Sequence, residues 1–202
     1  MSFQGIRNGR LVVFEGIDGT GKSTHIKYLR AYLEEKGIEV VQSYEPTHGQ
    51  WGKKLRDSAS TGRLSIEEEV ELFLKDRREH VESLIGPALE RGAWVLLDRY
   101  YLSMMAYQGA RGVNTTEIRR MNEEFAPIPD AVVWLDIPVS VALERIGNRG
   151  GLDAFETEAG LTACREVFAS IHEPWMLRVD GDGTQEVVAE RVRAALAPML
   201  NV

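Results

Sequence analysis

Short apolar runs alternate with longer amphipathic stretches along the whole chain. Most of these runs are nearly continuous Val, Leu and Ile, a pattern typical of strands that are covered on both faces. The runs span residues 11–15, 38–44, 94–98, 131–136 and 176–180. The pattern therefore predicts five buried strands.

Helical periodicity fills the stretches between the runs. The predicted helices cover residues 22–36, 49–59, 66–91, 101–109, 115–126, 138–148, 157–173 and 184–200. Gly37, Gly92 and Gly181 lie where helices or strands should end, and the acidic residues 67–69 suit the first turn of a helix. Strands that alternate with crossover helices predict an α/β fold, in which a parallel sheet carries helices on both faces.

Composition and charge narrow the class of protein. The 202 residues are 44% hydrophobic and 27% charged, and without an interdomain linker they are expected to form one domain over residues 1–202. A net charge of −7 disfavours a nucleic-acid partner, because such proteins are usually basic. Cys164 is the sole cysteine, which fits a reducing cytoplasm. We expect no signal peptide, because the first residues, MSFQGIRNGR, lack the apolar core of about 7–15 residues that such a peptide carries. We expect no membrane span either, because no apolar run approaches the roughly 20 residues required.

The first predicted strand runs directly into a glycine-rich turn. Residues 16–23 read G-I-D-G-T-G-K-S and match the P-loop pattern G-x-x-x-x-G-K-[ST]. The glycines let consecutive backbone N–H groups point inward and cradle phosphate oxygens, together with the N-terminus of the following helix. Lys22 can reach the β- and γ-phosphates, and Ser23 can offer its hydroxyl to Mg²⁺. The predicted nucleotide site comprises Gly16, Ile17, Asp18, Gly19, Thr20, Gly21, Lys22, Ser23 and Thr24.

A metal at this turn needs an acidic ligand as well, and two of the strands end in aspartate. Asp98 is followed by Arg99 and Tyr100, which indicates a charged pocket, whereas Asp136 is followed by Ile-Pro, which is typical of a helix start. An aspartate at a strand end also commonly caps the next helix. Both positions stay open, and the neighbouring residues favour Asp98.

A P-loop does not identify the group that receives the phosphate, because several classes of protein use it. The chain has no N-K-x-D segment, with which signalling GTPases read guanine. A motor ATPase usually needs more chain than this. A compact chain with a Gly/Arg-rich segment at residues 147–153 favours a nucleoside-monophosphate kinase.

Six segments occur together in one order that is typical of a known family. They are F-E-G-I-D-G-T-G-K-S-T at 14–24, E-P-T at 45–47, F-L-K-D-R at 73–77, D-R-Y at 98–100, A-Y-Q-G at 106–109 and D-A-F-E at 153–156. In these segments the chain resembles the thymidylate kinases, which phosphorylate dTMP to dTDP with ATP. The resemblance implies a P-loop NTPase fold with strand order 2-3-1-4-5, a mobile lid, bound Mg²⁺ and usually a homodimer.

The resemblance also implies roles for residues at the matching positions. Phe73 would stack on the thymine ring, and Arg77, one helical turn later, would donate to a base carbonyl. Arg99 would clamp the acceptor phosphate as a catalytic residue. Asp18, also catalytic, would read the 3′-hydroxyl of the sugar. The rest of the acceptor site would comprise Glu15, Arg56, Tyr107, Gln108, Asp153 and Phe155.

The lid is expected at about residues 145–156. Some members of the family carry an arginine in the P-loop where this chain has Gly19. The positive charge over the γ-phosphate should then come from the lid, from Arg149 or from Arg145 just before it. Which of the two arginines is catalytic stays open, and Arg145 is also expected to contact ATP.

Two positions depart from the pattern of the family. Met104 stands where a small polar residue is usual, and Ala154 stands where many members with a glycine in the P-loop carry arginine. A thioether is a poor partner for a base N–H. A kinase of the same fold that acts on another nucleoside monophosphate or on a small phosphate acceptor therefore remains an alternative. A nucleotide-binding switch without transfer activity is the third class, although a switch has no second substrate to hold.

Overall fold

The strands form one sheet. The computed structural model describes residues 8–61, 64–148 and 157–200. The strands are β1 (Arg10–Glu15), β2 (Val40–Tyr44), β3 (Trp94–Asp98), β4 (Ala131–Asp136) and β5 (Met176–Asp180). All neighbours pair in parallel, in the order β2-β3-β1-β4-β5. The predicted parallel sheet and its strand order are confirmed.

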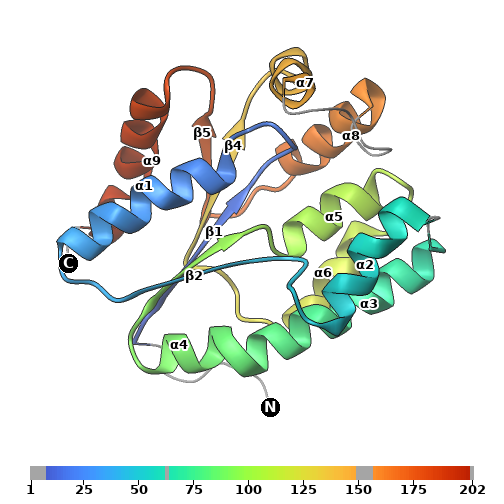
Figure 1. The fold of residues 1–202 in the computed structure, drawn as a ribbon, viewed down its shortest axis with the longest axis horizontal. Coiled ribbons are helices and arrows are strands. Elements are labelled where there is room, and N and C mark those ends of the chain that lie inside the picture. Colours follow the sequence, from blue (N-terminus) through green and yellow to red (C-terminus); the bar gives the residue numbers. More distant parts are fainter. Residues whose placement is uncertain (1–7, 62–63, 149–156, 201–202) are drawn as a thin grey trace.

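Helices connect successive strands and cover both faces of the sheet (Figure 1). They are α1 (Lys22–Glu35), α2 (Gln50–Thr61), α3 (Ile66–His80), η1 (Val81–Ile85), α4 (Gly86–Glu90), α5 (Tyr101–Gly109), α6 (Thr115–Glu123), α7 (Val139–Gly147), α8 (Glu158–Ala169) and α9 (Gln185–Leu200). The predicted helix over residues 66–91 is present, but the π-helical turn η1 divides it. Local sequence gives no clear signal for such a turn.

Each strand contributes side chains to two separate apolar cores. On β1, Val12 and Phe14 pack in a core with residues of α1 and α9. Leu11 and Val13 point to the opposite face, into a core that includes residues of η1, α4, α5 and α8. Because successive side chains of a strand point to opposite faces, a sheet with helices on both sides needs apolar residues at nearly every position. This explains the continuous apolar runs in the sequence.

The carboxyl ends of the parallel strands meet at one edge of the sheet, where such folds bind ligands. β1 ends at Glu15 and leads into the P-loop, β3 ends at Asp98, and Glu45 follows the end of β2. Helix α3 lies next to this edge. Its N-terminus is fixed by a capping box, in which Ser65 and Glu68 hydrogen-bond each other's backbone N–H.

Candidate active site

The P-loop has a backbone path that only glycine can follow at two positions. Gly16 has φ 138°, and a Cβ atom there would lie 2.5 Å from the carbonyl oxygen of Leu135. Gly19 has φ 82°, and its Cβ would lie 2.7 Å from the carbonyl oxygen of Ala142. The loop therefore sits tightly against the end of β4 and against α7, and it delivers the N-terminus of α1 to the site.

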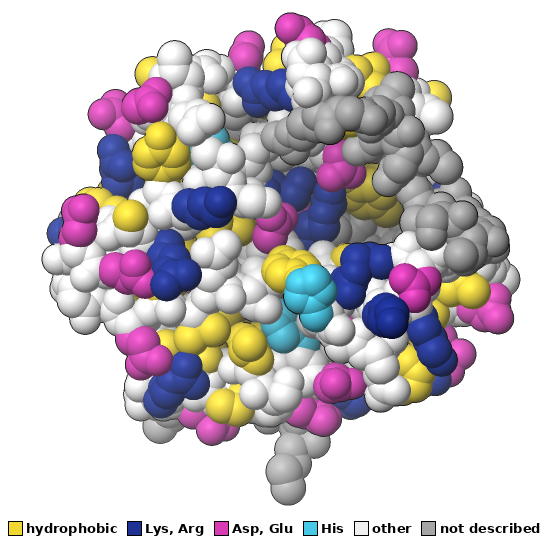
Figure 2. Space-filling model, in the orientation of Figure 1, with side chains coloured by type: hydrophobic (Ala, Val, Ile, Leu, Met, Phe, Trp, Pro, Cys, Tyr) yellow, Lys and Arg dark blue, Asp and Glu magenta, His cyan; other side chains and the backbone are white. Residues whose placement is uncertain are grey.

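A cavity of about 600 Å³ opens beside this loop. Figure 2 shows a hollow near the centre of this face, with Lys, Arg, Asp and Glu side chains gathered in and around it. The cavity is lined by Asp18, Gly19, Gly21, Lys22, Ser23, Thr24, Gln42, Ser43, Tyr44, Glu45, Asp98 and Arg99. Gly16, Ile17 and Thr20 belong to the loop but do not line the cavity, and the Thr20 hydroxyl donates to the carbonyl oxygen of Ile17 at 3.0 Å.

Lys22 is folded against its own loop. Its side-chain Nζ donates to the carbonyl oxygens of Gly16 and Ile17 at 3.0 and 3.1 Å, and the residue is only 7% exposed. Burial, together with the charge of Arg99, lowers the pKa of Lys22 from 10.5 to about 8. The ammonium is thus held among phosphate-binding groups with little water around it, so an anion that enters the cavity would interact with it strongly.

The two carboxylates considered for the metal have different surroundings. Ser23 Oγ donates to Asp98 Oδ2 at 2.5 Å, so these two residues meet at the P-loop. Asp136 is held instead by Arg165 and Arg178, in ion pairs at 2.6 Å. The geometry therefore favours Asp98 over Asp136.

Ser23 and Asp98 also suit Mg²⁺ chemically. Mg²⁺ usually takes one or two protein oxygens and fills its remaining positions with waters and substrate phosphates. In the part of the chain that the structure describes, no group of three or more His, Cys, Asp or Glu could hold a metal by itself. One hydroxyl and one carboxylate beside a phosphate cradle are the ligand set expected for such a shared ion.

A second cavity, of about 240 Å³, adjoins the first, because Asp18, Glu45 and Arg99 line both. It brings together residues of α2, α3 and α5. Its other lining residues are Pro46, Leu55, Arg56, Ser58, Glu69, Phe73, Arg77, Tyr100, Ser103, Met104, Tyr107 and Gln108. Among the residues that the structure describes, all those predicted to bind the acceptor line this second cavity, except Glu15.

Arg99 lies at the junction of the two cavities in an unusual backbone conformation. Its backbone φ angle is 69°, a left-handed value that residues other than glycine rarely adopt. Its guanidinium donates to Asp18 Oδ1 at 2.5 Å and to Ser103 Oγ at 3.1 Å, and Tyr107 donates its hydroxyl to Asp18 Oδ2 at 2.7 Å. Burial raises the pKa of Asp18, but Arg99, Lys22 and Tyr107 outweigh it and hold that pKa well below its usual value.

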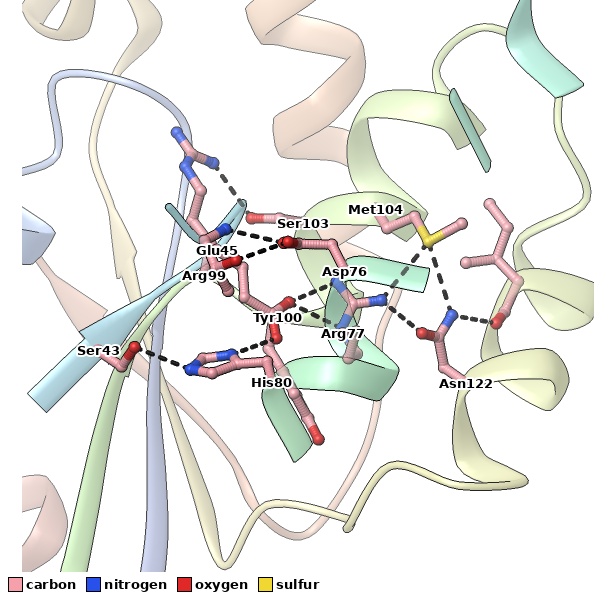
Figure 3. Close-up of polar contacts among 12 residues, drawn as sticks. Ser43, Glu45, Asp76, Arg77, His80, Arg99, Tyr100, Ser103, Met104 and Asn122 are labelled. Carbon is pink, nitrogen blue, oxygen red and sulfur yellow. Dashed lines mark hydrogen bonds and ion pairs between the residues drawn. The ribbon is translucent and has the colours of Figure 1, made fainter. Parts of the chain in front are cut away.

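Arg77 is fixed from several sides in the wall of the second cavity (Figure 3). Its Nε donates to Glu45 Oε2 at 2.8 Å. Its Nη1 donates to Asn122 Oδ1 and, at 3.6 Å, to the sulfur of Met104. The side chain is 1% exposed. Asn122 also donates to the sulfur of Met104, at 3.6 Å. The thioether of Met104, the residue that departs from the family pattern, is therefore already hydrogen-bonded to Arg77 and Asn122.

A buried chain of polar groups continues from Glu45 to β2. Nδ1 of His80 lies 3.0 Å from Glu45 Oε1, and its Nε2 lies 2.8 Å from Ser43 Oγ. Because a carboxylate only accepts hydrogen bonds, Nδ1 carries the proton and donates it to Glu45. Figure 3 shows this series from Ser43 through His80 to Arg77. It links the wall of the first cavity to that of the second.

Glu15 lies behind both cavities. It is fully buried, and its carboxylate accepts hydrogen bonds from the backbone N–H groups of Tyr100 and Ser103 and, at 2.5 Å, from the Ser103 hydroxyl. Burial raises the pKa of Glu15 from 4.5 to about 7 despite these bonds. Glu15 thus anchors the N-terminus of α5, and the contact with substrate that the sequence suggested stays a prediction.

The remaining predicted site residues lie at the rims or outside the described residues. Arg56 donates to the carbonyl oxygens of Pro46 and Thr47 at 2.8 and 2.5 Å. Nη1 of Arg145 lies 3.5 Å from the carbonyl oxygen of Gly19, beside the P-loop. The predicted lid residues Arg149, Asp153 and Phe155 are outside the described residues. So is Ala154, the second position that differs from the family pattern.

Some residues of the site were not singled out from the sequence. Asn122 accepts a hydrogen bond from Arg77, and His80 binds Glu45, the counter-ion of Arg77. Glu69 and Arg111 form an ion pair next to Gln108. Glu69 is 42 residues from Arg111 and 39 residues from Gln108 along the chain, so these contacts could not be inferred from a local pattern. The helical spacing of Glu69, Phe73, Arg77 and His80 does place all four on one face of α3, which was the available signal.

Comparison with known proteins identifies the family. The family model described as thymidylate kinase matches residues 14–192. The chain belongs to the thymidylate kinase family. A thymidylate kinase of Akkermansia muciniphila is 78% identical over 197 residues, which are 98% of this chain and 96% of its own. A thymidylate kinase of Xanthomonas campestris pv. campestris is 48% identical over 199 residues, 96% of this chain and 87% of its own.

As a member of the thymidylate kinase family, the chain is a nucleoside-monophosphate kinase with a P-loop NTPase fold. The family match covers all the elements that line the two cavities. Within the described ranges, no helix is both long and apolar enough to cross a membrane.

Proposed function

We propose that this member of the thymidylate kinase family transfers the γ-phosphate of ATP to the phosphate of dTMP, giving dTDP for dTTP synthesis. The observation that carries the proposal is the pair of adjoining cavities. One is lined by the P-loop, the other by Phe73 and Arg77, and Arg99 lines both. Two phosphorylated substrates that enter from the two sides would meet at Arg99 and Lys22.

On the donor side, the P-loop amides and Lys22 bind the β- and γ-phosphates, and Arg145 contacts the nucleotide. Ser23 and Asp98 would hold Mg²⁺. When bound, that ion neutralises charge on the phosphate oxygens.

On the acceptor side, Arg99 clamps the phosphate of dTMP with its planar guanidinium. Phe73 stacks on the base, and Arg77, held by Glu45, donates to a base carbonyl. Asp18 reads the 3′-hydroxyl and is aligned by Tyr107. Arg56 and Gln108 complete the pocket, and Glu15 supports it from behind. Arg149, Asp153 and Phe155 are proposed to close over it as a lid.

The reaction needs positioning more than covalent chemistry. The acceptor is already a phosphate oxyanion, so no strong general base is required. Lys22, Arg99 and Arg149 offset the negative charge of the transferred group, and a closed lid excludes water as a competing acceptor.

The assembly and location form a separate part of the proposal. We propose a homodimer in the cytoplasm, with no nucleic-acid partner. The acidic net charge of −7 and the single, buried cysteine are consistent with this setting. Sedimentation analysis of the purified protein measures the oligomeric state directly.

A panel of nucleoside monophosphates tests the function. With Mg-ATP, we expect ADP release to be fastest with dTMP, and we expect Lys22→Ala to fold normally but to lose turnover by orders of magnitude. Faster release with another monophosphate would assign the chain a different acceptor. No release with any of them would favour a nucleotide-binding switch.

A further inference from the structure

Glu45 uses its two carboxylate oxygens for different partners (Figure 3). Nε of Arg77 donates to Oε2 at 2.8 Å, and Nη2 of Arg77 lies 2.7 Å from the same oxygen. Oε1 accepts a hydrogen bond from Nδ1 of His80 at 3.0 Å. The side chains of Arg77, Glu45 and His80 are only 1%, 3% and 4% exposed. Because so little of these side chains meets water, solvent cannot replace a contact that is lost.

The contact with Oε1 determines how the carboxylate of Glu45 is turned. In the usual fork of an arginine and a carboxylate, two parallel N–H bonds to the two oxygens fix the plane of each group. Here both nitrogens of Arg77 approach one oxygen, so the pair alone does not fix the plane of the carboxylate. The hydrogen bond from His80 to the other oxygen supplies the missing constraint.

The backbone around Glu45 is fixed independently of its side chain. Its N–H donates to the carbonyl oxygen of Asp98 at 3.0 Å. Two residues later, the N–H and the hydroxyl of Thr47 both donate to the carboxylate of Asp76, at 2.8 and 2.6 Å. The freedom left to Glu45 is therefore mainly the rotation of its carboxylate, and His80 limits that rotation.

We infer that His80 is a positioning residue, which through Glu45 sets the orientation of the Arg77 guanidinium that meets the acceptor base. The inference rests on the proposed function and deepens it, because it adds a residue that acts on base recognition without touching the substrate. Among the described residues, Glu45 and Arg77 line the acceptor cavity and His80 does not. An effect of His80 on the base is therefore transmitted by these two side chains.

Two analogues of dTMP measure the contact between Arg77 and the base. In 2-thio-dTMP and in 4-thio-dTMP, one carbonyl oxygen of the base is replaced by sulfur, which is a much weaker acceptor. The wild type should prefer dTMP over one of these analogues by about tenfold in kcat/KM, because the charged donor loses its acceptor. This preference reports the orientation of Arg77, whereas general damage to the fold would lower kcat/KM for dTMP and the analogue together.

The two ring nitrogens of His80 provide a matched pair of variants. In His80→Gln the amide nitrogen can replace Nε2, which lies 2.8 Å from Ser43 Oγ, but Oε1 of Glu45 loses its donor. The preference for dTMP should then shrink by about threefold or more. In His80→Asn the amide nitrogen can replace Nδ1 and donate to Glu45, so this variant should retain the preference although it also loses the ring. Glu82→Gln, which changes an exposed carboxylate two residues further on, should leave kcat/KM unchanged for all three nucleotides.

An unchanged preference in His80→Gln, or an equal loss of preference in His80→Gln and His80→Asn, overturns the inference. If His80→Gln does not fold, His80→Phe decides, because it keeps a ring and removes both nitrogens. The preference should shrink in that variant, and an unchanged preference overturns the inference. A wild type that treats dTMP and both analogues alike would show that Arg77 does not contact the base, and the inference would fail with that contact. The rate of the wild type with dTMP tests the proposed function separately.

Discussion

The guanidinium of Arg77 and the carboxylate of Glu45 form an ion pair at 2.7 Å whose side chains are 1% and 3% exposed. The two residues come from α3 and from the segment after β2, so the pair joins two elements in the wall of the acceptor cavity. Burial raises the pKa of Glu45, but Arg77 and His80 outweigh it and hold that pKa below its usual 4.5.

Glu45→Gln should therefore be strongly destabilising, because it leaves the charge of Arg77 buried without a counter-ion. We expect the free energy of unfolding to fall by about 3 kcal/mol and the KM for dTMP to rise more than kcat falls. Urea unfolding and steady-state kinetics measure both. The control is Glu39→Gln in the exposed pair with Arg91, where a loss of about 1 kcal/mol at most is expected. Equal losses in the two variants would contradict the prediction.

The same pair predicts how stability responds to acid. The pKa of Glu45 is lowered in the folded state, so its contribution is present above pH 4.5 and is lost as the pH falls through the folded pKa. Below pH 4.5 the wild type should lose stability faster than Glu45→Gln. Denaturant titrations of both proteins between pH 3 and 6 would show this as converging curves. Parallel curves would argue that Glu45 is not the group that titrates.

The lowered pKa of Lys22 predicts an alkaline limit for ATP binding. Its pKa of about 8 means that the free enzyme loses this charge above pH 8. The affinity for ATP should then fall by up to about tenfold per pH unit. Calorimetric titration with ATP from pH 7 to 10 measures it. Lys22→Arg, which cannot be deprotonated in this range, should bind ATP with little dependence on pH. If the affinity of the wild type for ATP stayed constant up to pH 10, the lowered pKa of Lys22 would be ruled out.

How far the sequence predicted the site depends on the distance over which each contact acts. The P-loop and the ends of the strands follow from local patterns, so Lys22, Ser23 and Asp98 could be placed in advance. Ser23 and Asp98 are 75 residues apart in the sequence. Asp98 ends β3, and Ser23 begins α1 just after the loop that follows β1, so the parallel sheet brings both to the same edge. The partners of Arg77 were not predictable in this way, because Asn122 reaches it from α6 across a packed interface that no local pattern describes.

Arg99 offers a way to separate backbone strain from side-chain function. Its φ of 69° costs a residue with a Cβ atom about 1–2 kcal/mol relative to glycine. Arg99→Gly and Arg99→Ala both remove the guanidinium, so both should abolish most kinase activity. The glycine variant should nevertheless be the more stable by about 1 kcal/mol, as measured by urea unfolding. If the alanine variant were equally stable, the left-handed conformation would not be a source of strain.

The contact between Ser23 and Asp98 predicts a change in the requirement for Mg²⁺. Ser23→Ala and Asp98→Asn should each raise the Mg²⁺ concentration that gives half-maximal activity, by about tenfold or more. The first removes one of the two ligands that we propose for the ion, and the second removes the negative charge of the other. The assay varies Mg²⁺ at a fixed ATP concentration and a saturating dTMP concentration. Asp136→Asn is the matched control, since Asp136 also ends a strand but is held by Arg165 and Arg178. It should lower stability and leave the Mg²⁺ requirement unchanged. A shift in Asp136→Asn without one in Asp98→Asn would move the metal to β4 and reverse the assignment.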